Sequence, residues 1–174
     1  MNTNWKRIIH MYGRATDTPD YLEALTGNDR ELIDAATSHL ESAIVHQSTI
    51  SMAAVPVLEA LLEAMRSGWI TDPYAIKQVF EWLIYLAEST GPVSAKEVPE
   101  LDSVLLDQVE AFDSETDAET FLEEEGFELY EATFYWALYH VNALAAAVVA
   151  VLEAKPWVLV ADVEIVTQKW RALM

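Results

Sequence analysis

Residues Asp72 to Gly91, with the sequence DPYAIKQVFEWLIYLAESTG, form the most clearly bounded segment of this 174-residue chain. Pro73 stands at the first helical position, where its missing N–H is tolerated, and Gly91-Pro92 breaks the pattern. Between these limits the apolar residues recur three and four positions apart: Ile76, Val79, Phe80, Leu83 and Leu86. This spacing predicts an amphipathic helix with one buried face.

Two further helices are predicted before this segment. Asn28 is the expected N-cap of a helix that ends near Gln47, and a second helix runs from about Ser51 to Gly68. The stretch 92–99, which holds Pro92 and Pro99, is predicted to be the longest loop.

After this loop the pattern predicts a short helix from about 100 to 112 and another over 115–125, capped by Ser114 and ended by Gly126. Pro156 precedes a last helix from about 157. The apolar stripe of that helix is Leu159, Val163, Val166, Trp170 and Leu173.

The segment 128–153 is apolar on almost every side, and Thr133, His140 and Asn142 interrupt it. A helix that is apolar all round is usually buried, so we expect one central, most buried helix here. Its length also matches a membrane span, but the mid-segment His140 and Asn142 and the absence of a basic cluster beyond Lys155 argue against that interpretation.

About seven helices with no convincing strand predict an all-α fold in a single domain, 1–174. The loop at 92–99 offers a possible subdivision into 1–91 and 100–174. Paired helices at a spacing of roughly 40 residues are typical of an α-solenoid.

Three motifs resemble the bacterial HEAT-repeat-like, armadillo-type helical proteins. They are the stretches MYGRATDTP at 11–19, IVHQST at 44–49 and AVPVL at 54–58. The resemblance covers about residues 8–66 and implies a HEAT-like α-α superhelix that acts as a binding surface.

The negative charge of the chain is concentrated in one block. The net charge is −19, and residues 97–154 contain 15 Asp or Glu and no Lys or Arg. Such a surface repels nucleic acid and anionic lipid and attracts basic proteins. We therefore expect a basic protein partner such as a toxin, with no nucleic acid and no membrane partner.

Catalytic signatures are absent from the sequence. The chain has no Cys and no Gly-x-Ser-x-Gly elbow, and its five Gly residues are scattered singly, so no phosphate-binding loop can be assembled. We expect no catalytic residue and no cofactor. The lack of Cys suits a reducing cytoplasm, and the first 12 residues do not resemble a signal peptide, so a cytoplasmic location is expected.

Metal sites are not predicted either. His39 and His46 lie seven residues apart, a spacing that a metal could bridge, but the His-Glu-x-x-His signature is missing. The acids between Asp113 and Glu124 match several positions of a calcium loop. However, Ala118 stands where the sharp turn needs Gly, so a capped acidic helix explains the same residues better.

The function that fits these features best is a non-catalytic immunity or inhibitor protein that neutralises a basic toxin or nuclease. Its carboxylates would pair with Arg or Lys of the partner. The residues expected to bind the partner are Asp113, Glu115, Asp117, Glu119, Glu123, Glu124 and Glu125.

Besides the interpretation that the negative charge only maintains solubility, two alternatives stay open. The first is a helical-repeat scaffold or regulatory protein that binds a peptide or helix through apolar contacts, with Trp5, Trp69 and Trp157 as possible anchors at element ends. The second is a small-ligand binder or enzyme with a pocket at the central helix, beside His140 and Asn142. His46 and Gln47 are interpreted as capping the end of a helix.

Overall fold

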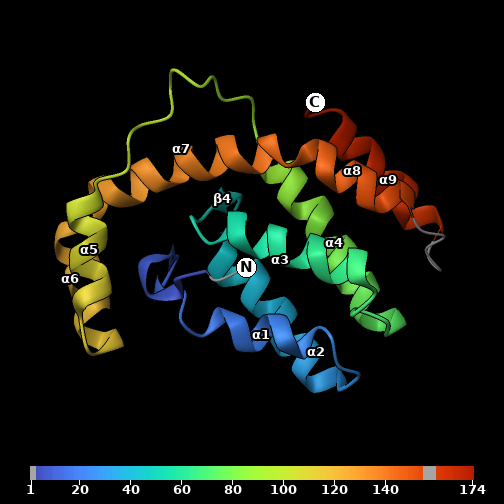
Figure 1. Ribbon diagram of the computed structural model, residues 1–174, viewed down its shortest axis with the longest axis horizontal. Helices are drawn as coiled ribbons and strands as arrows, with labels where there is room; N and C mark the ends of the chain where they lie inside the picture. The colour runs from blue at the N-terminus through green and yellow to red at the C-terminus, as the bar shows by residue number, and fades with distance from the viewer. Residues whose placement is uncertain (1–2, 155–159) are drawn as a thin grey trace.

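The computed structural model describes residues 3–154 and 160–174, with side chains in the second range from residue 163 onward. The fold is all-α, as the sequence predicts, and helices dominate the described residues (Figure 1). In chain order the elements are η1 (Trp5–Arg7), β1 (Ile9–His10), β2 (Gly13–Arg14), α1 (Thr18–Ala24), α2 (Arg30–His39), η2 (Leu40–Ile44), β3 (Val45–His46), β4 (Thr49–Ile50), α3 (Ala54–Ser67), α4 (Pro73–Ser89), α5 (Ser103–Ala111), α6 (Glu115–Glu125), α7 (Phe127–Ala143), α8 (Ala145–Ala154) and α9 (Val160–Arg171).

The main core lies between two rows of helices. One row runs through α2, α4 and α9, and the other through α1, α3 and α8, so that each helix of a row contacts the next (Figure 1). Helix α4 lies in the middle of the first row, and two buried indoles join it to its neighbours. Trp82 Nε1 donates to the Leu40 carbonyl at 3.1 Å, and Trp170 Nε1 donates to the Leu83 carbonyl at 3.1 Å. Each indole N–H therefore has a partner, as a buried donor requires.

A second, smaller core holds α5 and α6 against the N-terminal strands. Its buried side chains are Ile9, Met52, Leu106, Val109, Leu122 and Leu129. Figure 1 shows α5 and α6 side by side at one end of the molecule, with α7 extending from them to α8. The segments before and after the loop at 92–99 thus pack together at both ends.

The two β-hairpins and the helices that follow them form an internal repeat. Strands β3 and β4 and helix α3 begin at residues 45, 49 and 54, each 36 residues after β1, β2 and α1 at 9, 13 and 18. The strand register repeats as well, since Ile9 pairs with Arg14 and Val45 pairs with Ile50. The tetrapeptide Leu-Glu-Ala-Leu recurs with the same offset at 22–25 and 58–61.

The hairpins correct two sequence expectations. The helix expected to reach Gln47 ends at Ile44, so His46 and Gln47 do not cap a helix but lie in the second hairpin. Gln47 and Ser48 have φ of 48° and 65°, the left-handed pair that a two-residue hairpin turn needs. Neither residue type signals such a turn, which is why the sequence did not predict it.

Helix boundaries differ from the prediction in two further places. Helix α1 was not predicted, although Pro19 lies in its first turn. Asp29, not Asn28, caps α2, because its side chain accepts the N–H groups of Glu31 and Leu32. The described part of the C-terminal helix is Val160–Arg171, and its predicted start near 157 lies outside the described residues, as does Leu159 of its predicted stripe. Val166 and Trp170 of that stripe are buried.

The central segment is two helices rather than one. Helices α7 and α8 meet at Leu144 with a bend of 41°, and the Leu144 N–H bonds both the His140 and Val141 carbonyls. The segment is also not the most buried part of the fold: Tyr135 is 39% exposed, and α7 and α8 each bury five residues, whereas α3 and α4 each bury eight. Apolar composition predicts burial, but aromatic residues with a polar edge tolerate partial exposure.

Within the described ranges, no single helix combines the length and apolar character that crossing a membrane requires. Helices α7 and α8 pass that test only when they are taken together across their bend.

Candidate functional site

A pocket of about 390 Å³ lies where the N-terminal hairpin meets α1, α2 and the acidic helix α6. His10 and Arg14 reach it from the hairpin, and His39 reaches it from the end of α2. Asp17, directly before α1, and Glu119 of α6 also line it. The pocket thus joins the acidic helix to two imidazoles, of which the sequence analysis considered His39 only as a partner of His46.

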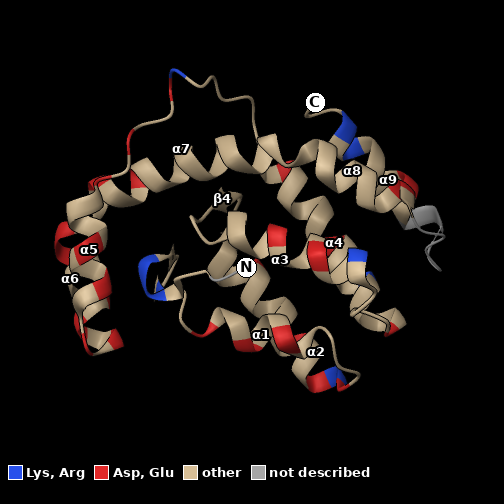
Figure 2. Cartoon of the chain, in the orientation of Figure 1, with Lys and Arg blue, Asp and Glu red and all other residues tan. Residues whose placement is uncertain are grey.

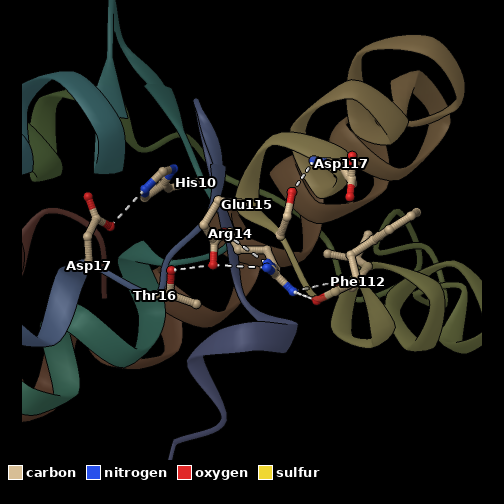
Figure 3. A network of polar contacts seen from close by, with 9 residues as sticks. His10, Arg14, Thr16, Asp17, Phe112, Glu115 and Asp117 are labelled. Atoms are coloured by element: carbon tan, nitrogen blue, oxygen red, sulfur yellow. Dashed lines mark hydrogen bonds and ion pairs between the residues drawn. The ribbon is translucent and has the colours of Figure 1, made fainter.

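Asp17 lies between two histidines (Figure 3 shows His10 beside it). The Tyr12 N–H donates to His10 Nδ1 at 3.1 Å, so His10 carries its ring proton on Nε2 and donates to Asp17 Oδ1 at 3.2 Å. His39 Nδ1 is 3.8 Å from Asp17 Oδ2. Both imidazoles are buried, with 5% and 8% of their surface exposed, whereas Asp17 remains open to solvent.

The charge states of this group follow from burial and contact. Burial lowers the pKa of His39 to about 4, against the opposing effect of Asp17, so this imidazole is neutral at pH 7. Partial burial would raise the pKa of Asp17, but the hydrogen bond from His10 and the nearby imidazoles outweigh it and lower that pKa. At neutral pH Asp17 is therefore a carboxylate.

Arg14 fixes α6 to the hairpin (Figure 3). Its side chain is only 1% exposed, and its Nε and Nη2 each donate to a Glu115 carboxylate oxygen at 2.9 Å. Nη1 donates to the Phe112 carbonyl at 2.7 Å and to the Val109 carbonyl at 3.2 Å. Thr16 adds a hydroxyl hydrogen bond to Glu115 at 2.9 Å. One arginine thus joins β2 to the end of α5 and the start of α6.

Glu115 therefore differs from the other residues expected to bind a partner, because its carboxylate is already held within the chain. Partial burial would raise its pKa, but hydrogen bonds from Arg14 and Thr16 lower it below the ordinary value. Glu119 of α6 lies beside Gly13 of β2. If Gly13 carried a Cβ, that atom would be 3.8 Å from the Cβ of Glu119. Gly13 has φ of 121°, which side chains rarely adopt.

The remaining predicted residues are exposed acids that lie around α6 or directly before it. We use the name α6 face for this set, which is Asp113, Asp117, Glu119, Glu123, Glu124 and Glu125. All six are exposed, and no cationic side chain among the described residues forms an ion pair with any of them. Figure 2 shows the acidic residues of α5 and α6 gathered at one end of the molecule.

The geometry of α6 follows from its sequence. Ser114 caps it by accepting the Asp117 N–H at 3.0 Å, which confirms the capped acidic helix rather than a calcium loop. Ala118 and Leu122 are its buried residues. Gly126 allows the abrupt passage into α7, since a Cβ there would lie 2.4 Å from the Leu122 carbonyl oxygen.

A second clamp lies beside the first. Arg7 of η1 forms ion pairs with Asp107 and Glu110 of α5, and Asn4 donates to Glu110 at 2.7 Å. The contact with Asp107 raises the pKa of Arg7. The N-terminal segment thus neutralises part of the acid on α5 but leaves the α6 face without cations among the described residues.

The other sequence candidates lie apart from this pocket. His39 does not pair with His46; its ring lies 5.5 Å from that of His10. His140 packs on Trp136 with ring centroids 4.3 Å apart, and Asn142 Nδ2 donates to the Gly91 carbonyl at 2.8 Å. The Asn142 Oδ1 atom, by contrast, is buried without a hydrogen-bond partner among the described residues, and the hypothesis of a pocket at the central helix stays a prediction.

Two of the three predicted Trp anchors come together. Trp5 and Trp69 line one groove of about 280 Å³ between α1 and α3, and Trp69 is 61% exposed. Trp157 lies outside the described residues.

Sequence reasoning missed the triad of His10, Asp17 and His39 because these residues belong to three elements, with no short motif linking them. The one signal available was the internal repeat, in which His10 recurs as His46. Comparison of the chain with protein-family models, curated proteins and solved structures finds no match.

Proposed function

We propose that this chain is a non-catalytic binding protein whose α6 face engages a basic protein, as an immunity or inhibitor protein does with a toxin or nuclease. The observation that carries this proposal is the set of six exposed carboxylates on α6 without an internal cation among the described residues. Carboxylates displayed in this way can occupy the cationic surface on which a nuclease would otherwise bind phosphates.

The contacts that hold α6 against the N-terminal segment support the same function. Arg14 ties α6 to the N-terminal hairpin, and Arg7 ties α5 to the segment before that hairpin. A helix held in place loses little conformational freedom when a partner binds, and preorganisation increases affinity. The clamps therefore suit α6 to recognition, whereas a purely solubilising acidic segment would need no such anchoring.

The two rows of helices and the 36-residue repeat support a HEAT-like superhelix as the finer description of the fold. In this proposal the superhelix is the scaffold, and α6 is the part that contacts the partner.

The experiment compares two sets of neutralised variants. Proteins captured by the chain from native lysate at low salt would be identified, and the association rate of the principal basic partner measured by surface plasmon resonance. In the test variant, Asn or Gln replaces all six residues of the α6 face. The matched control neutralises six exposed acids elsewhere: Asp20, Glu23, Glu31, Glu41, Glu100 and Glu164.

Both variants change the net charge equally, so they separate a local surface from overall charge. We expect the test variant to reduce the association rate about tenfold or more at low salt, and the control to reduce it much less. Equal effects would show that only the total charge matters and would contradict the proposal.

A second candidate function is favoured by the groove beside Trp5 and Trp69. Its apolar lining and exposed indole suit a peptide or helix bound by apolar contacts, in which Trp residues often contribute most. Changing Trp69 to Ala should then weaken binding in both low and high salt, a result that the electrostatic mechanism does not produce.

A further inference from the structure

The triad of His10, Asp17 and His39 brings three metal-ligand groups together from three separate elements. One ligand atom from each residue lies within 4.8 Å of the others. The two imidazoles are buried, and the carboxylate closes the triad on its solvent side (Figure 3 shows His10 and Asp17). Nothing in the proposed function uses this arrangement.

We propose that His10, Asp17 and His39 bind one divalent transition-metal ion through His10 Nε2, the Asp17 carboxylate and His39 Nδ1. Metal-to-ligand distances of about 2.0–2.2 Å place tetrahedral ligands roughly 3.4 Å apart, so a spacing of 4.8 Å must close by about 1.4 Å. Two nitrogens and one oxygen suit zinc and its first-row neighbours, whereas calcium and magnesium require oxygen ligands.

His39 is already arranged as a ligand. Thr18 Oγ1 lies 2.9 Å from its Nε2, and the Tyr21 ring stacks on it at 4.2 Å, so the imidazole has a fixed orientation. Its Nδ1 faces Asp17 Oδ2 at 3.8 Å, beyond hydrogen-bond distance. A cation between these two atoms would satisfy both.

When the metal binds, the ring proton of His10 must move from Nε2 to Nδ1. The Nε2 proton, now donated to Asp17, would be displaced, and the ring would carry its proton on Nδ1 instead. Nδ1 could then no longer accept the Tyr12 N–H. Tyr12 is 53% exposed and lies in the hairpin turn, so its N–H can turn to water at small cost. This exchange gives the site a spectroscopic signature.

The pocket leaves room for further ligands. Its 390 Å³ open toward Ser42 and Glu119, which allows water to complete the coordination. A site with three protein ligands and an open position has the arrangement of a reactive or exchangeable metal centre rather than a closed structural one.

The internal repeat provides a control within the same chain. His46 occupies in the second hairpin the position that His10 has in the first, and the counterpart of Asp17, 36 residues later, is Ala53. The second hairpin thus has the histidine without the carboxylate. A surface histidine that binds metal adventitiously would not distinguish the two hairpins, whereas a built site would.

The test is isothermal titration of the full chain, freed of metal by a chelator, with ZnCl2 and separately with MgCl2. We expect one equivalent of Zn²⁺ to bind and Mg²⁺ not to compete. Asp17→Asn and His39→Gln should each weaken Zn²⁺ binding by at least about tenfold, and His46→Gln should leave it unchanged. In the ¹H–¹⁵N spectrum, Zn²⁺ should shift the Tyr12 amide, and Asp17→Asn should abolish that shift at the same Zn²⁺ concentration.

Far-UV circular dichroism of each metal-free variant establishes that it is folded before titration. If His39→Gln unfolds, the Asp17→Asn variant still tests the site, because Asp17 is exposed and its replacement leaves the core unchanged. No uptake of Zn²⁺ by the folded wild-type chain would overturn the proposal. Uptake that survives Asp17→Asn, or is lost equally in His46→Gln, would also overturn it and would indicate adventitious binding.

Discussion

Arg14 and Glu115, 101 positions apart in the sequence, form an ion pair in which two guanidinium nitrogens each bond one carboxylate oxygen at 2.9 Å. The arginine is buried and the glutamate is half exposed. This pair, with the two carbonyls that Arg14 also binds, joins the acidic helix to the N-terminal hairpin. It determines where the α6 face lies relative to the pocket.

Changing Arg14 to Met should loosen α5 and α6. The Phe112 and Val109 carbonyls would lose their donor, and each unsatisfied buried acceptor costs about 1–3 kcal/mol. We expect the free energy of unfolding in urea to fall by about 2–4 kcal/mol, with faster amide hydrogen exchange in α6. Glu115→Gln, which leaves the carbonyl bonds in place, should cost less. If amide hydrogen exchange in α6 is the same in the Arg14 variant as in the wild type, Arg14 does not hold α6 in place.

Acid should weaken the same clamp. The pKa of Glu115 is lower in the folded chain than its ordinary value, so near pH 4 the unfolded chain binds more protons at this residue. Its contribution is fully present above pH 4.5 and is lost as pH falls through the folded-state pKa. Hydrogen exchange in α6 should therefore accelerate below pH 4.5 more in the wild type than in Glu115→Gln, after correction for the intrinsic exchange rate. Parallel pH profiles would rule out this contribution.

Trp170 should matter far more to stability than Trp69. Trp170 is fully buried and bonds the Leu83 carbonyl, whereas Trp69 is 61% exposed. Trp170→Ala should lower the free energy of unfolding by about 3–5 kcal/mol, and Trp69→Ala should change it by about 0.5 kcal/mol or less. Thermal unfolding followed by circular dichroism measures both. Similar losses in the two variants would show that α9 is not part of the main core.

Salt should act on the rate of partner binding rather than on the fold. Exposed charges lose most of their mutual influence beyond about 8 Å at physiological ionic strength. We expect the association rate with the basic partner to fall steeply between 0.05 and about 0.5 M salt. The variant lacking the α6 face should show a shallower dependence. An association rate that does not change with salt would leave the apolar groove as the better binding surface.

The sequence alone determined the all-α class, the caps of α4 and α6, and the acidic character of α6. These features depend on neighbours within one turn of helix, such as the Ser114 side chain and the Asp117 N–H, and local patterns report such contacts. The repeat of 36 residues was also present in the sequence, but weakly, through a few shared positions such as His10 and His46.

Only the tertiary structure decided which charges are free and which histidines meet. Glu115 has the same residue type as Glu119, yet one is held by Arg14 from a distant hairpin and the other stands at an open pocket. His39 meets His10 rather than His46 because a hairpin replaces the predicted end of the helix. Contacts between elements far apart in the chain depend on how the helices pack, and no local spacing of residues records that packing.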